Sequence, residues 1–84
     1  MENKVLVVLN LPELDETFDI MIPISRKIGN IIELISKFLN EETEGQYQID
    51  VHKNLYNKET GQRYNNNQLV IETDIRNGTR LILI

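Results

Sequence analysis

Residues 77–84 constrain the fold of this chain more than any other stretch. They begin with Asn77-Gly78, the pair most typical of tight turns, because both residue types tolerate a positive φ. Every residue after Arg80 is leucine or isoleucine. A strand this apolar is covered on at least one face and is often central in its sheet. We therefore expect a core strand here, and we expect the chain to end in that strand without a tail.

The chain has 84 residues, which predicts one domain spanning 1–84 with a single modest core. It contains no cysteine, which excludes disulfide bonds, thiolate zinc sites and a cysteine nucleophile. A chain without cysteine suits the reducing cytoplasm, where we expect this protein to act.

The charge pattern argues against nucleic acid as a partner. The formal net charge is −4, and the nine lysines and arginines are scattered along the chain. Nucleic-acid binding needs a clustered basic face. The apolar runs at 5–9 and 81–84 are too short to span a bilayer, so we predict no membrane insertion. We expect no signal peptide, because no small-residue cleavage site follows the first run.

The first 22 residues predict a β-hairpin. Residues 4–10 form an apolar run with β-branched members and no helical gap, which is typical of a strand. Pro12 ends the run, because proline donates no hydrogen bond to a strand ladder. Residues 17–22 then alternate, with Phe18, Ile20 and Ile22 on one face of a second strand.

Residues 27–40 predict an amphipathic helix. Its apolar residues recur at helical spacing in one stripe, made of Ile28, Ile31, Ile32, Ile35, Phe38 and Leu39. Isoleucine is a weak helix former, so packing onto a sheet would explain a stripe this rich in isoleucine. We assign the whole stripe to the core.

The C-terminal half predicts three more strands. Residues 47–52 alternate apolar and polar, which is typical of a half-buried third strand. We expect a polar loop at 53–60, a short fourth strand at 61–64, a turn at 65–67 and a 3₁₀ turn within 68–76. The final strand follows, so the predicted order is β-β-α-β-β-β.

This order resembles the β-grasp fold of ubiquitin. Residues 61–64, Gly-Gln-Arg-Tyr, are similar to the Gly-x-x-apolar turn and short strand of ubiquitin. The ending is similar too, with Ile75, a turn, and then Leu81 and Leu83 alternating. The resemblance covers nearly the whole chain. It implies an α+β fold, a ubiquitin-like β-grasp with a mixed sheet and one helix packed across it.

Three stretches resemble the YukD-like (EsaB-like) family of small bacterial ubiquitin-like proteins. They are the helix entry at 27–35, the strand at 48–51 and the ending at 75–81. That family is linked to type VII (WXG-protein) secretion in Gram-positive bacteria. The resemblance implies a non-conjugated accessory or regulatory protein that binds a component of the secretion machinery. A ubiquitin-fold binding module of an unrelated pathway is the alternative.

Catalysis and conjugation are not expected. Covalent modifiers and sulfur carriers of this fold act through a flexible tail ending in Gly-Gly, whereas this sequence ends in Leu83-Ile84. A general base needs an orienting partner and a cleft, and the only histidine, His52, has Asp50 as its nearest same-face carboxylate. We predict that both lie on the solvated side of a strand. The acidic loops at 13–16 and 41–44 lack calcium-loop spacing, so we predict solvating charge and no cofactor or metal site.

The open face of the predicted sheet carries the candidate binding site. If alternate residues of the first and last strands face the helix, the others form an apolar cluster on the opposite face. The predicted protein-binding residues are Leu6, Val8, Ile82 and Ile84, with His52 and Arg80 at the rim. Contiguous exposed apolar surface marks an interface, here with another protein or with a second copy of the chain. A different strand register, or cover by residues 53–68, would remove it.

Overall fold

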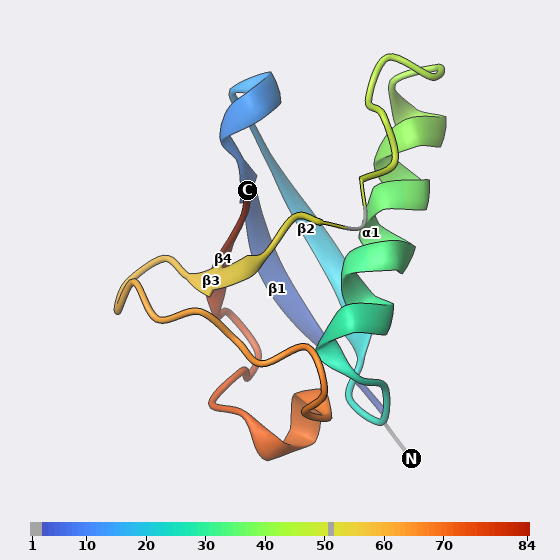
Figure 1. Cartoon of the computed structure of the whole chain (residues 1–84). Coiled ribbons are helices and arrows are strands. Elements are labelled where there is room, and N and C mark those ends of the chain that lie inside the picture. The colour runs from blue at the N-terminus through green and yellow to red at the C-terminus, as the bar shows by residue number, and fades with distance from the viewer. Residues whose placement is uncertain (1–2, 51) are drawn as a thin grey trace.

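The computed structural model describes residues 3–50 and 52–84, in which a four-stranded sheet packs against one α-helix (Figure 1). In chain order the elements are β1 (Lys4–Leu11), the 3₁₀ turn η1 (Pro12–Leu14), β2 (Glu16–Pro23), α1 (Ile28–Glu42), β3 (Leu55–Asn57), the 3₁₀ turn η2 (Val70–Glu72) and β4 (Arg80–Leu83). The strand order across the sheet is β2-β1-β4-β3. The central pair β1–β4 is parallel and the two outer pairs are antiparallel, so the sheet is mixed as expected.

The β1–β2 hairpin is paired along its whole length, from Lys4 opposite Pro23 to Leu11 opposite Glu16. The chain reverses in η1, where Pro12 starts the turn and Asp15 adopts a left-handed φ of 51°. Val7 on β1 is fully buried. The predicted hairpin and its alternation are therefore confirmed.

β4 is a central strand between β1 and β3, as predicted from its composition, and Leu81 and Leu83 are fully buried. The Asn77-Gly78 turn precedes it and is closed by a 3.0 Å hydrogen bond from the Thr79 N–H to the Arg76 carbonyl. Within this pair only Gly78 has a positive φ, of 89°. Asn77 is therefore not needed for a positive φ, and its role in the turn is a different one.

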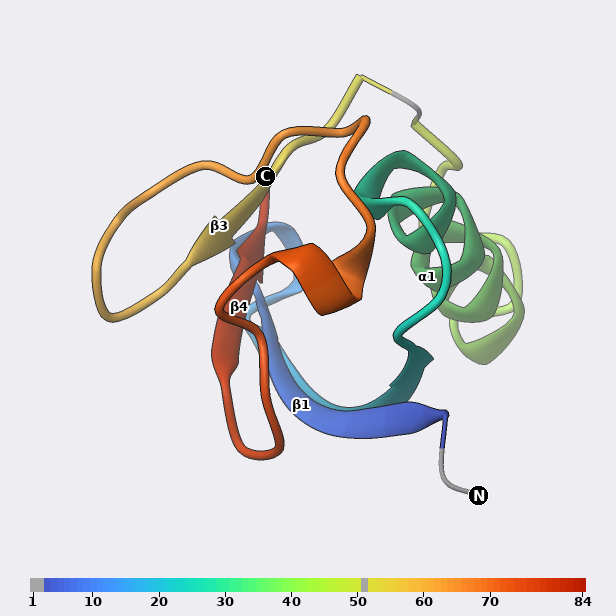
Figure 2. The same ribbon diagram turned by 90° about the horizontal axis from the view of Figure 1, so that it is seen from below.

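The sheet curves around one side of the molecule, and both α1 and η2 lie on that side (Figure 2). The core fills the space between them. Its largest fully buried side chains are Leu9, Leu11, Leu55, Leu81 and Leu83 from the strands, Ile28, Ile31, Ile32, Ile35 and Leu39 from α1, and Tyr47 and Ile75 from the connections. No helix in the described part of the chain is long and apolar enough to cross a membrane.

The helix begins one residue later and ends two residues later than predicted. Its isoleucine stripe is buried, but Phe38 is 39% exposed and lies at the margin of the stripe. Its ring is perpendicular to that of Phe18 of β2, with 6.2 Å between the ring centroids. Assigning Phe38 to the core was therefore wrong, because β2 is the edge strand and no further strand of the described chain lies beyond it to cover this side chain.

The N-terminus of α1 is capped by a distant loop. The N–H groups of Ile28 and Gly29 donate to the carbonyls of Gln68 and Asn66, at 2.8 and 3.0 Å. The Lys27 side chain makes no capping bond. A Cβ atom on Gly29 would lie 3.3 Å from the Asn66 carbonyl oxygen, so glycine permits the close approach of this loop.

The third strand was predicted in the wrong place. None of the described residues of 47–52 belongs to a strand, and Val51 lies outside the described residues. Tyr47 is instead tied to the end of α1, with its N–H bonded to the Thr43 hydroxyl and its carbonyl to the Asn40 amide. β3 starts at Leu55, inside the predicted loop. The predicted fourth strand at 61–64 is reduced to one bridge between Tyr56 and Arg63.

Candidate protein-binding surface

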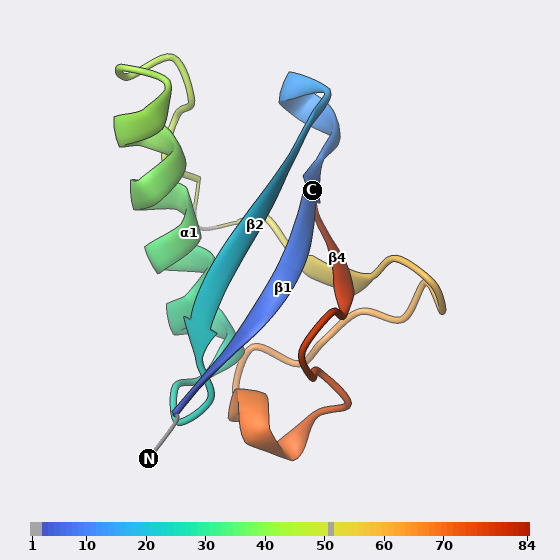
Figure 3. The same ribbon diagram turned by 180° about the vertical axis from the view of Figure 1, so that it is seen from behind.

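The face of the sheet that points away from α1 is here called the outer sheet face. Figure 3 views the molecule from the side opposite to Figure 1, with β2, β1 and β4 in front and no helix crossing them. The residues of this face are Leu6, Val8 and Asn10 of β1, Thr17, Asp19 and Met21 of β2, Tyr56 of β3, and Arg80 and Ile82 of β4, followed by Ile84. Leu6 is 41% and Ile84 52% exposed, while Val8 and Ile82 are half-buried. These four side chains therefore lie on the face away from the helix, as the binding hypothesis requires.

The strand register separates the apolar side chains into two groups. In the parallel pair, Val8 lies opposite Arg80, and Asn10 lies opposite Ile82. Val8 and Ile82 are therefore diagonal neighbours, with a polar or charged residue beside each. The single aliphatic cluster expected from the sequence is instead an apolar group on each side of a polar centre.

Two apolar residues of this face were not among the predicted protein-binding residues. Met21 lies opposite Leu6 and is 48% exposed. Tyr56 lies opposite Ile82 and is half-buried. The alternation of the second strand already placed Met21 away from the helix, so hairpin register alone would have identified it. Tyr56 could not be found, because its strand was assigned to a loop.

The polar centre is positively charged. Arg80 and Lys58 line a shallow hollow of about 260 Å³ together with Val8, Asn10 and Thr17. Neither cationic side chain makes a hydrogen bond or ion pair with any other described residue. Arg80 thus lies inside the surface, not at its rim, and its charge is available to a partner.

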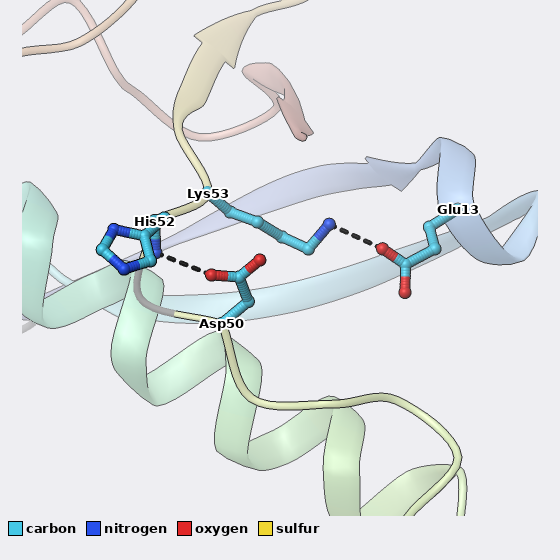
Figure 4. Close-up of polar contacts among 4 residues, drawn as sticks. All are labelled: Glu13, Asp50, His52 and Lys53. Atoms are coloured by element: carbon cyan, nitrogen blue, oxygen red, sulfur yellow. Dashed lines mark hydrogen bonds and ion pairs between the residues drawn. The ribbon is translucent and has the colours of Figure 1, made fainter.

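His52 is not placed on a strand. It lies in a turn before β3, and its backbone N–H donates to the Asp50 carboxylate at 2.9 Å (Figure 4). The expectation that His52 and Asp50 share one face of a strand was therefore wrong. The carboxylate holds the backbone of the turn and does not orient the imidazole, because an Asp side chain readily bonds the N–H two residues later.

The acidic loop at 13–16 does more than solvate the surface. Glu13 accepts a 2.6 Å hydrogen bond from the Lys53 ammonium, which joins η1 to the segment before β3 (Figure 4). The Lys53 nitrogen also lies 5.8 Å from the centre of the Tyr47 ring. The bond to Glu13 raises the pKa of Lys53, because it stabilises the charged form.

Comparison with known proteins identifies the fold. No model of a protein family matches the chain, and no curated protein sequence does either. The chain has the ubiquitin-like β-grasp fold. A solved ubiquitin-like domain of the Mycobacterium tuberculosis type VII secretion protein ECCD1 superposes with a TM-score of 0.70 at 13% identity, covering 99% of each chain. The β-grasp fold predicted from element order is thereby confirmed.

Two further β-grasp structures match over 99% of this chain. One belongs to the MycP5-free ESX-5 inner membrane complex, with a TM-score of 0.78 and 15% identity, and this chain spans 21% of its length. The other is the ubiquitin-like domain of an Arabidopsis thaliana protein, with a TM-score of 0.72 and 12% identity, of which 78% is covered. Because β-grasp domains share this architecture across many roles, these similarities establish the fold alone.

Proposed function

We propose that this protein is a non-catalytic, ubiquitin-like accessory or regulatory component of a Gram-positive type VII secretion system. It acts in the cytoplasm by binding a protein partner without covalent conjugation. Three sequence stretches that resemble the YukD-like family support the secretion role. The similarity in fold to a domain of ECCD1 and to part of the ESX-5 inner membrane complex supports it further.

The outer sheet face is the observation that carries the binding role. A large apolar side chain that is nearly half exposed costs free energy in water, and neighbouring ones usually mark an interface. Leu6 and Met21 form such a pair at one side, and the half-buried Ile82 and Tyr56 form a less exposed pair at the other. Arg80 stands between the two pairs. This pattern fits a partner that places apolar side chains on both sides of a carboxylate.

Two aspartate substitutions test the surface without threatening the fold. Leu6→Asp and Ile84→Asp alter exposed side chains, whereas aspartate at the half-buried Val8 or Ile82 would test folding as well. Ile71→Asp is the matched control, because Ile71 is 56% exposed on η2, away from the outer sheet face. Circular dichroism should give the same spectrum for all three variants.

The binding experiment is cross-linking of the tagged protein in its own cells, followed by mass spectrometry of the adducts. The wild-type protein and Ile71→Asp should yield the same component of the secretion machinery, and the other two variants should lose it. Size-exclusion chromatography with light scattering tests a second copy as the partner. Unchanged adducts from Leu6→Asp and Ile84→Asp would contradict the surface assignment.

The secretion role has a separate readout. Deletion of the gene should change the amount of WXG-type proteins in the medium, and the wild-type gene should restore it. If cross-linking finds a partner through the outer sheet face but secretion is unaffected, the domain serves an unrelated pathway. That outcome rejects the secretion role and keeps the binding role.

A further inference from the structure

Asn77 is the one asparagine of the sequence that is followed by glycine. In such a pair the backbone nitrogen of the glycine can attack the side-chain carbonyl carbon of the asparagine, because glycine has no Cβ atom to obstruct the approach. The bond from that carbon to the side-chain nitrogen breaks, ammonia leaves, and a cyclic succinimide remains. Water then opens the ring at either carbonyl and yields aspartate or isoaspartate. Whether this deamidation occurs here depends on what restrains Asn77 and Gly78.

A single residue of β1 holds both groups that take part in the attack. The Leu6 N–H donates to the side-chain oxygen of Asn77, and the Leu6 carbonyl accepts from the Gly78 N–H. The attacking nitrogen must lose its proton and turn toward the Asn77 side chain, and its bond to the Leu6 carbonyl opposes both changes. The bond to the side-chain oxygen holds the other reactant in place. Leu6 therefore opposes the reaction at both of its ends.

The conformation of the turn is a second restraint. The Thr79 N–H bonds to the Arg76 carbonyl, and Gly78 has a φ of 89°, which are the features of a type II turn. The Arg76 N–H also donates to the Thr79 hydroxyl at 2.8 Å. A type II turn has a ψ of about +120° at the position of Asn77, whereas the succinimide ring needs about −120°, as in a type II′ turn. The turn must therefore open before the ring can close.

We infer that Asn77 is a deamidation site controlled by the contact of its turn with Leu6. The site is inert while the contact holds, and the attack becomes possible when the turn leaves β1. Asn77 and Gly78 are both exposed, so this opening can be local and need not unfold the core. The modification is spontaneous and consumes only water.

The two products should affect the fold differently. Aspartate leaves the main chain unchanged, and its carboxylate can still accept the Leu6 N–H. Isoaspartate lengthens the main chain by a methylene group, so the side-chain oxygen and the Gly78 N–H no longer match the two groups of Leu6. This turn directly precedes the pairing of Val8 with Arg80. Isoaspartate should therefore weaken the alignment of the two central strands, and aspartate should not.

The first test compares the folded and the unfolded chain at one mildly alkaline pH. The wild-type protein is incubated in buffer and in denaturing urea, and mass spectrometry of its peptides measures deamidation at Asn77. A synthetic peptide of residues 74–80, incubated in both solutions, corrects for the effect of urea on the chemistry. Deamidation should be slower in the folded chain by about tenfold or more. Equal corrected rates would overturn the inference.

The second test loosens the turn alone. Thr79→Val removes the hydroxyl that accepts from the Arg76 N–H, and it should speed up deamidation of Asn77 and amide exchange of Gly78 by the same factor. Thr60→Val is the matched control, because the Thr60 hydroxyl also accepts a backbone N–H in a turn, from Gln62, and both rates should stay at the wild-type value. Faster exchange without faster deamidation would contradict control by opening.

The third test measures the products. Each adds a negative charge, so ion exchange separates them from the unmodified chain. Urea denaturation should give Asn77→Asp nearly the wild-type midpoint and the purified isoaspartate form a lower one. An isoaspartate form as stable as the wild-type protein would overturn the predicted effect on strand alignment.

Discussion

The side-chain oxygen of Asn77 accepts a hydrogen bond from the backbone N–H of Leu6 at 2.8 Å. The next residue, Gly78, donates its N–H to the Leu6 carbonyl at 2.7 Å. The backbone N–H and carbonyl of Leu6 are thus both hydrogen-bonded, just before the pairing of β1 with β4 begins at Val8. The turn therefore aligns the two central strands, and with them the outer sheet face.

Replacing Asn77 with alanine should lower the free energy of unfolding by about 1 kcal/mol, because the Leu6 N–H loses its acceptor. The cost is modest, since water can reach this exposed N–H. Urea denaturation followed by circular dichroism measures the change, with Asn30→Ala on the exposed face of α1 as the control. A stability equal to that of the wild-type protein would show that the bond does not contribute.

Replacing Tyr64 with phenylalanine should lower the free energy of unfolding by about 1–2 kcal/mol at pH 7. The Tyr64 hydroxyl donates to the Asp74 carboxylate at 2.7 Å and accepts from the Asn57 amide at 3.1 Å. Both bonds are lost, and Asn57 is itself buried. Urea denaturation at neutral pH gives the value directly, and no loss would contradict this role of the hydroxyl.

The same variant tests a pH dependence. Burial, followed by the bond to Asp74, raises the pKa of Tyr64 to about 12 from its ordinary value of 10.0. Below pH 10 both folded and unfolded chains keep the phenol proton, so stability is fully present. Between pH 10 and 12 the unfolded chain releases it first, and stability falls as pH rises. The fall should be smaller in Tyr64→Phe than in the wild-type protein, and an identical fall would exclude Tyr64 as its source.

Replacing Tyr47 with phenylalanine should have the opposite effect to Tyr64→Phe. Within the described part of the chain, the buried hydroxyls of Tyr47 and Ser36 have no hydrogen-bond partner, and burial raises the pKa of Tyr47. Removing an unsatisfied buried hydroxyl relieves a desolvation cost, so stability should stay equal or rise by up to about 1 kcal/mol. Thermal unfolding of the two variants side by side makes the comparison. Destabilisation of Tyr47→Phe would mean that its hydroxyl is bonded in solution.

The Glu13–Lys53 pair should contribute a small coupling energy. A double-mutant cycle with Glu13→Gln and Lys53→Met should give about 0.5–1 kcal/mol, because Glu13 is half exposed and solvent screens the pair. The raised pKa of Lys53 keeps this contribution at neutral pH and removes it as pH rises past the ordinary value of 10.5. A coupling of zero at low salt would show that the pair is not formed in solution.

Local patterns predicted the hairpin, the helix and the final strand correctly because each depends on residues close in the chain. Alternation in β1 placed Leu6 and Val7 on opposite faces, and the isoleucine stripe placed α1 on the sheet. The prediction of the third strand was wrong because the position of that strand depends on residues far apart in the chain. Residues 47–52 alternate locally, but the partner of β4 is chosen by the fit of Leu55 against Leu83, which lie 28 residues apart in sequence (83 − 55).

The sequence by itself determined the β-grasp architecture and that Leu6 and Val7 lie on opposite faces of their strand, because side-chain periodicity is a property of each strand alone. Only the tertiary structure decided that Leu6 and Ile84 lie on the face away from the helix. Only the tertiary structure decided that Val8 meets Arg80, since register depends on how two strands slide against each other. It also decided that Phe38 borders a groove, because the sheet ends at β2 and the margin of α1 is left uncovered. Strand register and the packing of α1 on the sheet therefore determine which side chains are exposed to a partner.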